Sequence, residues 1–239
     1  MAMLEVRAIS KSFGGLKALD GISFGVEKGE IFGLMGANGA GKTTLFAVIA
    51  GQIRPSSGEV LLRGTRITGL RPDRICRRGI SRTFQIVRPF AGITALENAT
   101  ISALYGSDRS LGRKEATKAA AEALDAVGLG KMKDRLAAEL TLSGQKRLEI
   151  ARALSTGAGI VLLDEVMAGL TPPEVDEMIA TLGSLRRERS LTFILVEHVM
   201  SALMTLSDRV LAMDRGRVLA LGAPAEISRN EEVLKAYFG

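Results

Sequence analysis

The chain has 239 residues, of which 46% are apolar and 24% charged, and its formal net charge is +6. These values predict one large folded domain, with or without a subdomain, and exclude a disordered or fibrous chain. No apolar segment approaches the about 20 residues that cross a bilayer, and Glu5 and Arg7 interrupt any signal core at the start. We therefore expect a soluble, intracellular protein that reaches a membrane only through a partner. The single cysteine, Cys76, excludes a disulfide framework and a cysteine-based metal site, and the positive charge favours anionic ligands.

The first half of the chain is predicted to be rich in strands. Residues 1–30 alternate with a period of two, which predicts antiparallel strands with glycine-containing turns. The apolar run EIFGLMG at 30–36 predicts a buried strand, followed by a helical pattern that ends at Gly51, and GEVLLRG at 58–64 predicts another strand. The basic stretch RPDRICRRGISR at 71–82 has no interleaved aromatic residues, so it indicates a solvated or partner-facing surface rather than a nucleic-acid site.

The second half alternates helices with strands. Helices are predicted within 111–130, 145–157 and 172–189, and buried strands within 159–165 and 191–198. DRVLAMDRGRVLALG at 208–222 predicts a hairpin that turns at Asp214-Arg215-Gly216. The alternation favours an α/β fold with a mainly parallel core sheet, an N-terminal antiparallel part and an inserted helical subdomain. We expect a single domain, 1–239, in which 1–85 and 153–239 form the core and 86–152 the helical subdomain.

The strongest motif is GANGAGKTT at 36–44, which fits the phosphate-binding P-loop pattern G-x-x-x-x-G-K-[ST] between a strand and a helix. Its glycines are expected to adopt positive φ and to let backbone N–H groups approach phosphate without a Cβ in the way. Lys42 is expected to reach the β- and γ-phosphates, and the Thr43 hydroxyl to bind Mg²⁺. The predicted nucleotide-binding set in this loop is Gly36, Asn38, Gly39, Ala40, Gly41, Lys42, Thr43 and Thr44.

Two acidic residues end the strand predicted at 159–165. Asp164 is expected to lie at the end of a strand beside the P-loop strand and to hold the Mg²⁺ shell, and Glu165 to polarise the attacking water as a general base. The alternative is that both acids only cap the following segment. His198, the only histidine, follows another buried strand at the end of the sheet, where such folds bind ligands. Gln85 has an amide able to contact metal or water.

Together these motifs resemble the nucleotide-binding subunits of ATP-binding cassette (ABC) transporters over essentially the whole chain. The resemblance identifies a P-loop at 36–44, a Q-loop at Gln85, a signature near 140–145, a Walker B strand at 160–165 and a switch histidine at His198. It implies that Gln85 contacts metal and water, and that Phe13 stacks on adenine, for which a hairpin core role is the alternative. RTFQIVRPFAGITALENATI, LDEVMAGLTPPE, FILVEHVM and VLKAYFG look closer still to the ATPases of importers for branched-chain amino acids, or for amides and urea.

The resemblance also implies a mechanism with two subunits, a homodimer or a heterodimer with a second ABC ATPase. Each ATP would lie between the P-loop of one subunit and the signature of the other, with closure before and opening after hydrolysis. Residues 86–100 would meet the permease subunits, an extracytoplasmic solute-binding protein would act indirectly, and no nucleic acid is expected. The chain would lie in the cytoplasm, peripheral to the membrane. A soluble ABC ATPase, acting for example in Fe–S assembly, is the alternative function.

The signature departs from the family pattern, Leu-Ser-Gly-Gly-Gln or Leu-Ser-Tyr-Gly in the importer subgroup. Family members place its leucine 24 positions before the Walker B aspartate, which selects Leu140. Thr141 then takes the serine position and contacts the γ-phosphate, while Ser143 and Gly144 take the positions of the last glycine and the glutamine. A local two-residue shift that makes Ser143 the contact is the alternative. Thr171 stands at the position of the usual D-loop aspartate, so the carboxylate through which that residue would couple the two sites is absent.

Overall fold

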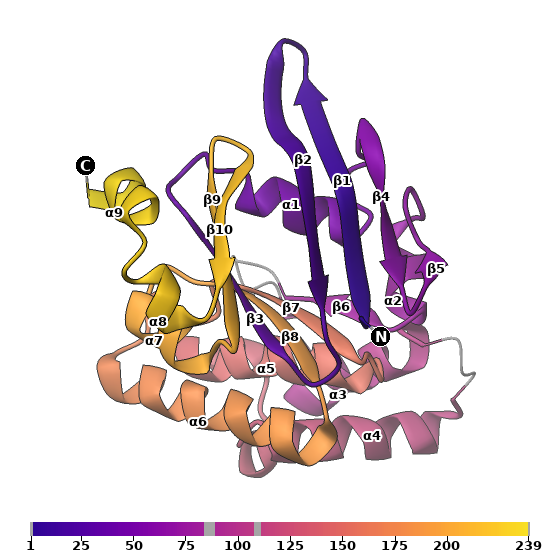
Figure 1. Ribbon diagram of the computed structural model, residues 1–239. Coiled ribbons are helices and arrows are strands. Elements are labelled where there is room, and N and C mark those ends of the chain that lie inside the picture. The colour runs from indigo at the N-terminus through magenta and orange to yellow at the C-terminus, as the bar shows by residue number, and fades with distance from the viewer. Residues whose placement is uncertain (1, 84–88, 108–110, 239) are drawn as a thin grey trace. The chain divides into compact units, whose positions relative to one another are not determined.

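The computed structural model describes residues 2–83, 89–107 and 111–238 (Figure 1). The chain divides into two compact units: unit 1 comprises Met1–Ile75 and Thr192–Gly239, and unit 2 comprises Cys76–Leu191. The α/β fold class predicted from the sequence is confirmed. The functional division into a core and a helical subdomain at 86–152 stays a prediction.

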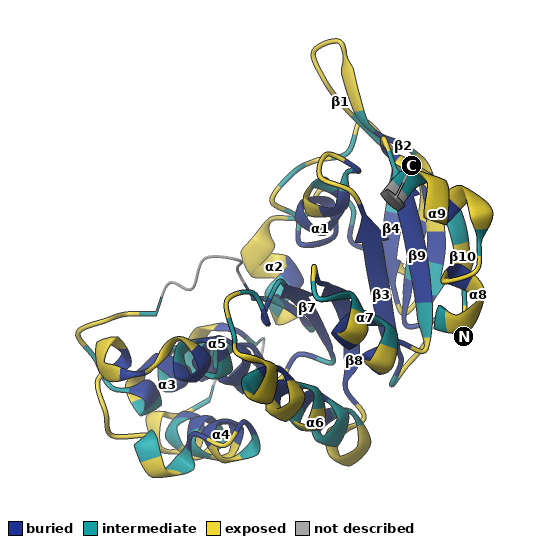
Figure 2. Ribbon diagram, turned by 90° about the vertical axis from the view of Figure 1, so that its left-hand side faces the viewer, coloured by how far each residue is buried: buried dark blue, intermediate teal, exposed yellow. Residues whose placement is uncertain are grey.

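The first sheet of unit 1 is antiparallel and arises from the alternating pattern at the start of the chain. Its strands are β1 (Leu4–Phe13), β2 (Leu16–Val26), β4 (Ser57–Leu62) and β5 (Thr65–Arg66), in the order β2-β1-β4-β5. Leu4, Val6 and Ile9 of β1 are at most 1% exposed, while the end of the β1–β2 hairpin is exposed (Figure 2). The period of two holds from Leu4 to Val6, and a shift in the β1–β2 pairing between Val6 and Ile9 returns Ile9 to the buried face after one extra residue.

The other strands of unit 1 place the P-loop. β3 (Ile31–Gly36) pairs in parallel with β8 (Thr192–Val196) on one edge and β9 (Arg209–Asp214) on the other. The expectation that the strand ending at Asp164 lies directly beside the P-loop strand is wrong, because β8 and β9 already take up the hydrogen bonds of both β3 edges. Both neighbours have fully buried apolar stretches, so the sequence pattern alone did not distinguish them from the strand at 160–164.

β9 and β10 (Arg217–Gly222) form the predicted hairpin. Arg215 and Gly216 both have positive φ, 42° and 78°, which is the geometry that a two-residue hairpin turn needs. The helices of this unit are α1 (Lys42–Ile49), α7 (Met200–Leu206), α8 (Pro224–Ile227) and α9 (Glu231–Phe238). α1 ends before Gly51, whose φ of 73° suits the residue after a helix. In the core, the Phe24 and Phe32 rings stack with centroids 5.0 Å apart.

Unit 2 combines two parallel strands with a group of helices; α2 (Pro72–Arg77) carries the chain into it. The strands are β6 (Ile80–Arg82) and β7 (Ile160–Asp164). The helices are α3 (Ala95–Tyr105), α4 (Arg113–Ala126), α5 (Leu142–Ser155) and α6 (Pro172–Arg189), with short 3₁₀ turns at Gly130–Met132 and Ala137–Glu139. Fully buried alanines at 95, 99 and 103 of α3 and at 116, 120 and 123 of α4 let these helices approach closely.

Two helices of unit 2 begin at capping boxes: α6, which was predicted, and α3, which was not predicted from the sequence. The boxes are formed by Thr94 with Glu97 in α3 and by Thr171 with Glu174 in α6, and Pro172 occupies the first turn of α6. None of the helices in the described part of the chain combines the length and hydropathy needed to cross a membrane.

Candidate nucleotide site

The predicted P-loop lies between β3 and α1 in unit 1. Gly41 is the N-cap of α1 with φ 103°, and a Cβ at this position would lie 2.7 Å from the carbonyl oxygen of Ala18 on β2. Gly39 also has positive φ, 85°, but open space around its Cα. At both positions the left-handed backbone favours glycine, and at Gly41 the close approach of β2 requires it.

Gly36 is required for a different reason from the one predicted. It lies within β3 and is not among the residues with positive φ. A Cβ on Gly36 would lie 2.6 Å from the carbonyl oxygen of Met213 and 2.7 Å from the Cβ of Ala40. The expectation of positive φ at this glycine is therefore wrong, because close packing of the loop against β9, and not backbone conformation, selects it.

Lys42 opens α1 and folds back over the loop. The residue is 7% exposed, and Nζ donates hydrogen bonds to the carbonyl oxygens of Gly36 (2.5 Å) and Ala37 (3.2 Å). Asn38, Gly39 and Thr43 are exposed, Thr44 is half-buried and Ala40 is buried. The exposed edge of the loop thus leads into the N-terminus of a helix, where backbone N–H groups and the helix dipole favour an anion.

His198 lies at the same edge of the sheet as the P-loop. β3 and β8 are parallel, and Leu34 pairs with Val196. Gly36 and His198 each follow their partner of that pair by two residues, so both stand at the carboxyl ends of neighbouring strands. His198 is exposed, which leaves the imidazole accessible to a ligand at this edge.

Phe13 lies at the exposed end of the β1–β2 hairpin, opposite Leu16, and is 48% exposed. This exposure contradicts the alternative that Phe13 packs in the core of the hairpin. Ala18, the residue whose carbonyl approaches Gly41, is two residues from Leu16 along β2, about 7 Å at the usual rise of a strand. The ring is therefore held on the strand pair that packs against the P-loop.

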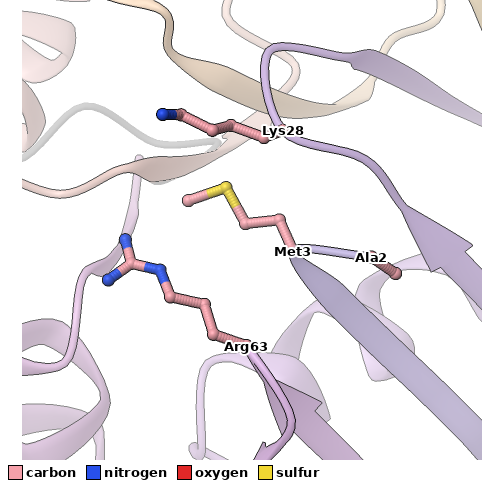
Figure 3. A pocket seen from close by; sticks show the side chains of 4 residues that line it. All are labelled: Ala2, Met3, Lys28 and Arg63. Carbon is pink, nitrogen blue, oxygen red and sulfur yellow. The ribbon is translucent and has the colours of Figure 1, made fainter.

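A separate cavity of unit 1 lies away from these residues. It has a volume of about 490 Å³ and is lined by Ala2, Met3, Lys28 and Arg63 (Figure 3). Lys28 precedes the first residue of β3, whereas the P-loop follows the last, so the cavity lies at the opposite end of that strand. The described residues of its lining include no carboxylate, imidazole or thiol that would support hydrolysis.

In unit 2, Asp164 and Glu165 follow each other at the end of β7 but differ in environment. Asp164 is 3% exposed, and its Oδ2 accepts a hydrogen bond from Nη2 of Arg82 at 2.6 Å. Glu165 is half-buried, and its φ of 51° lies in the left-handed region that residues other than glycine rarely adopt. The two carboxylates thus stand in different settings: one is paired and buried, the other carried by a strained backbone.

The signature turn begins α5. Thr141 is the N-cap, and its Oγ1 accepts a hydrogen bond from the backbone N–H of Gly144 at 3.2 Å. Thr141 and Leu142 are exposed, whereas Ser143 is 8% exposed and Gly144 is buried. A hydroxyl that accepts from the helix still has its own proton to donate, so Thr141 presents a donor at an exposed helix N-terminus.

The remaining predicted positions are Gln85 and Thr171. Gln85 lies outside the described residues. Thr171, at the D-loop aspartate position, caps α6: its backbone N–H and its hydroxyl donate to Glu174 Oε2 at 2.9 and 2.8 Å. These hydrogen bonds hold the pKa of Glu174 below its ordinary value.

The family model for the ABC transporter ATP-binding domain matches residues 19–168, which include both the P-loop and the strand ending at Asp164. The chain belongs to the ATP-binding cassette family. A second model, for the branched-chain amino acid ATP-binding cassette transporter, matches residues 217–239 of this cassette. Membership makes the chain a nucleotide-binding ATPase subunit.

The relatives that match the cassette over its full length are named for transport. It is 39% identical to the high-affinity branched-chain amino acid transport ATP-binding protein BraF of Pseudomonas aeruginosa and 36% identical to LivG, of the same description, from Escherichia coli K12. Each match covers 99% of this chain and 98% of the relative. Among solved structures, a nucleotide-free cassette from an ABC transporter has a TM-score of 0.91 at 30% identity over 100% of both chains. The ADP conformation of a transporter cassette has the same score and identity over 100% of this chain and 99% of the other.

Two side chains near the candidate residues were not found by sequence reasoning. Arg82 ends the basic stretch assigned to the surface, yet its side chain is 10% exposed and pairs with Asp164, so that assignment is wrong for Arg82. No local pattern marks it. Lys146 of the cassette's signature helix is 3% exposed, and its Nζ donates to the carbonyl oxygen of Glu165. Helical spacing would have found Lys146, since it shares a face with the buried Ile150 four residues later.

Proposed function

We propose that this cassette is the ATP-binding and ATP-hydrolysing subunit of an importer for branched-chain amino acids or related small polar solutes. The observation that carries the proposal is the 39% identity over essentially the full length to a branched-chain amino acid transport ATP-binding protein, together with the matching C-terminal family model. The soluble alternative gains no support from the relatives described above, whose names all refer to transport.

In the proposed site, the P-loop residues 36–44 bind the phosphates of ATP, and Phe13 stacks on the adenine. Two features support this: the exposed helix N-terminus after Gly41, and an exposed ring on the strand pair that packs against the loop. Lys42 exchanges its hydrogen bonds to the loop carbonyls for bonds to the β- and γ-phosphates. Such an exchange costs little, since one set of acceptors replaces another.

The donors available suit Mg²⁺. Thr43 offers an exposed hydroxyl and Asp164 a carboxylate, and hard oxygen ligands of this kind, few in number, are typical of Mg²⁺ bound together with substrate phosphates. Gln85 is proposed as a further contact to metal and water. When bound, the ion neutralises charge on the phosphates. Asp164 is held for this role by Arg82.

Hydrolysis is assigned to Glu165 and His198. Glu165 takes a proton from water as the water oxygen attacks the γ-phosphorus, and the bond to the β-phosphate oxygen breaks to release ADP. His198, exposed at the P-loop edge of the sheet, donates to the γ-phosphate. Glu165 thus activates the nucleophile, and His198 stabilises charge on the transferred phosphoryl group.

A second subunit completes the proposed site through its signature turn. Thr141 is favoured as the γ-phosphate contact, because it is exposed and its hydroxyl proton can be donated, whereas Ser143 is buried. Gly144 supports the contact by tying its N–H to the Thr141 oxygen. The partners are thus a second ABC ATPase, identical or paralogous, and permease subunits, which place the chain at the cytoplasmic face of a membrane.

The test is transport by the complete complex. The tagged chain is purified from its native membrane with whatever permease subunits accompany it and reconstituted in liposomes. We expect ATP-dependent uptake of labelled leucine that is lost with Lys42→Ala. Uptake of urea or a short amide in place of leucine would revise the solute. Co-purification of soluble partners alone, with no permease, would contradict the importer assignment.

A further inference from the structure

We propose that Lys146 is a positioning residue: it holds the backbone of Glu165 in the orientation needed for hydrolysis and so ties the signature turn to the hydrolytic glutamate of the same subunit. The inference rests on the proposed function in two respects, the assignment of Glu165 as general base and of Thr141 as the contact to the partner's nucleotide. All the groups involved belong to unit 2.

The first observation is the contact itself. Nζ of Lys146 lies 2.9 Å from the carbonyl oxygen of Glu165, and the lysine is 3% exposed. A lysine side chain loses much conformational freedom and hydration when it is buried, so a buried lysine has to be compensated by specific contacts. Lys146 extends from the second turn of α5 to the end of β7, and the carbonyl oxygen of Glu165 is one of the groups that accept a hydrogen bond from it.

The second observation is the conformation of the residue that receives this contact. Glu165 has φ 51°, a conformation that persists in a residue other than glycine only where its surroundings impose it. The Glu165 carbonyl also accepts from the N–H of Ala168 at 3.2 Å, which closes a turn just after β7. Two donors therefore converge on one carbonyl oxygen and hold the peptide group of Glu165, and with it the direction in which the Glu165 side chain leaves the backbone.

The third observation connects this turn to the signature. Gly169, at φ 79°, lies so close to Leu142 that a Cβ on it would be 3.1 Å from Leu142 Cδ2. Leu142 directly follows Thr141, the proposed γ-phosphate contact. The segment after β7 is thus bound to α5 at two places, at Lys146 and at Leu142. A displacement of the signature turn, when it meets the partner's nucleotide, is transmitted to Glu165.

This connection matters because the D-loop position lacks its aspartate. Thr171 is engaged in capping α6 and is bound to Glu174 through both its N–H and its hydroxyl. The link through Lys146 runs within one subunit and uses no D-loop side chain. It connects two nucleotide sites of the proposed dimer: the partner's site, which the signature turn contacts, and the site in which the subunit's own Glu165 acts.

The test compares Lys146→Met, Lys146→Arg and Arg147→Met in the full chain. Methionine keeps length and apolar volume but removes the donor, and arginine restores one. Arg147 is the matched control: it is the next residue of α5 and donates to the carbonyl of Val127 and to Glu177, not to Glu165. ATP turnover and the hydrogen exchange of residues 165–169, without nucleotide, are measured for each.

We expect Lys146→Met to lower kcat by about tenfold or more with KM for ATP within about twofold, and to speed exchange of residues 165–169. Lys146→Arg recovers most of the turnover. Arg147→Met leaves ATP turnover and the exchange of residues 165–169 unchanged, apart from any change caused by its effect on the melting temperature. Wild-type turnover and exchange in Lys146→Met, or equal losses in the Lys146 and Arg147 variants, would overturn the inference. If the wild-type chain hydrolyses no ATP, the proposed function fails instead, and the exchange data decide the positioning on their own.

Discussion

The guanidinium of Arg82 and the carboxylate of Asp164 form an ion pair in which Nη2 and Oδ2 are 2.6 Å apart and the side chains are 10% and 5% exposed. The pair joins the last residue of β6 to the last residue of β7, the two parallel strands of unit 2. A buried pair of this kind fixes the direction of Asp164, and breaking it from one side leaves an uncompensated charge.

The first prediction follows from this pair. Arg82→Met leaves the Asp164 carboxylate buried without this cation, so the free energy of unfolding falls by about 3 kcal/mol. Urea denaturation without nucleotide or Mg²⁺ measures it. The double variant Arg82→Met, Asp164→Asn removes both charges and recovers most of the loss. Additive losses in the double variant would show that the two side chains do not act as a pair.

Features of the site that depend on neighbouring residues could be predicted from the sequence. Features that depend on residues far apart along the chain could not. The P-loop and the hairpin turn at Arg215-Gly216 are local and were predicted. The caps at Thr94 and Thr171 were not predicted, although they follow from local rules. The role of Arg82 depends on a partner 82 positions away, and no local pattern carries that information.

The errors in the P-loop region have the same origin. Gly36 was expected to need positive φ, but what excludes a side chain there is the carbonyl of Met213 on a distant strand. The neighbours of β3 were misassigned because β7, β8 and β9 all have buried apolar stretches. Sequence reasoning thus identified which residues form the P-loop but not which strands border it.

The second prediction separates the two reasons for glycine in the P-loop. Gly39→Ala and Gly41→Ala both place a side chain at positive φ, which costs about 1–2 kcal/mol each. Gly41→Ala also brings a Cβ to 2.7 Å from the Ala18 carbonyl, while Gly39 has open space. Thermal unfolding should therefore show the larger loss for Gly41→Ala. Equal losses would mean that β2 adjusts without cost.

The third prediction concerns the register of the signature. Thr141→Ala removes the N-cap of α5, at about 1 kcal/mol, and also the proposed γ-phosphate contact, so ATP turnover falls by about tenfold or more. Thr94→Ala is the control: it removes an equivalent cap from α3 and should cost similar stability with turnover intact. Turnover lost in Ser143→Ala but kept in Thr141→Ala would select the shifted register instead.

The fourth prediction is a pH dependence at the start of α6. Hydrogen bonds from Thr171 lower the pKa of Glu174, so the folded state favours the ionised carboxylate more than the unfolded state does. The resulting stability is present above the ordinary carboxyl pKa of 4.5 and is lost as pH falls through the lower folded value. Glu174→Gln should therefore be less stable than the wild type at neutral pH. This difference in stability should shrink as the pH falls below 4.5 and through the lower pKa of the folded state.

Urea midpoints at neutral and acidic pH measure this difference. Glu188→Gln is the control, because Glu188 lies exposed in the last turn of the same helix and caps nothing. A difference between wild type and Glu174→Gln that stays constant from neutral to acidic pH would contradict the assigned cause.

The central claim, that this chain hydrolyses ATP with Glu165 as the base, is tested most directly by phosphate release from Glu165→Gln and wild type at equal ATP occupancy. Glutamine keeps the size of the side chain and removes its basicity. We predict that the variant binds ATP as the wild type does and releases phosphate at least about a hundredfold more slowly. Phosphate release at the wild-type rate from Glu165→Gln would contradict the account.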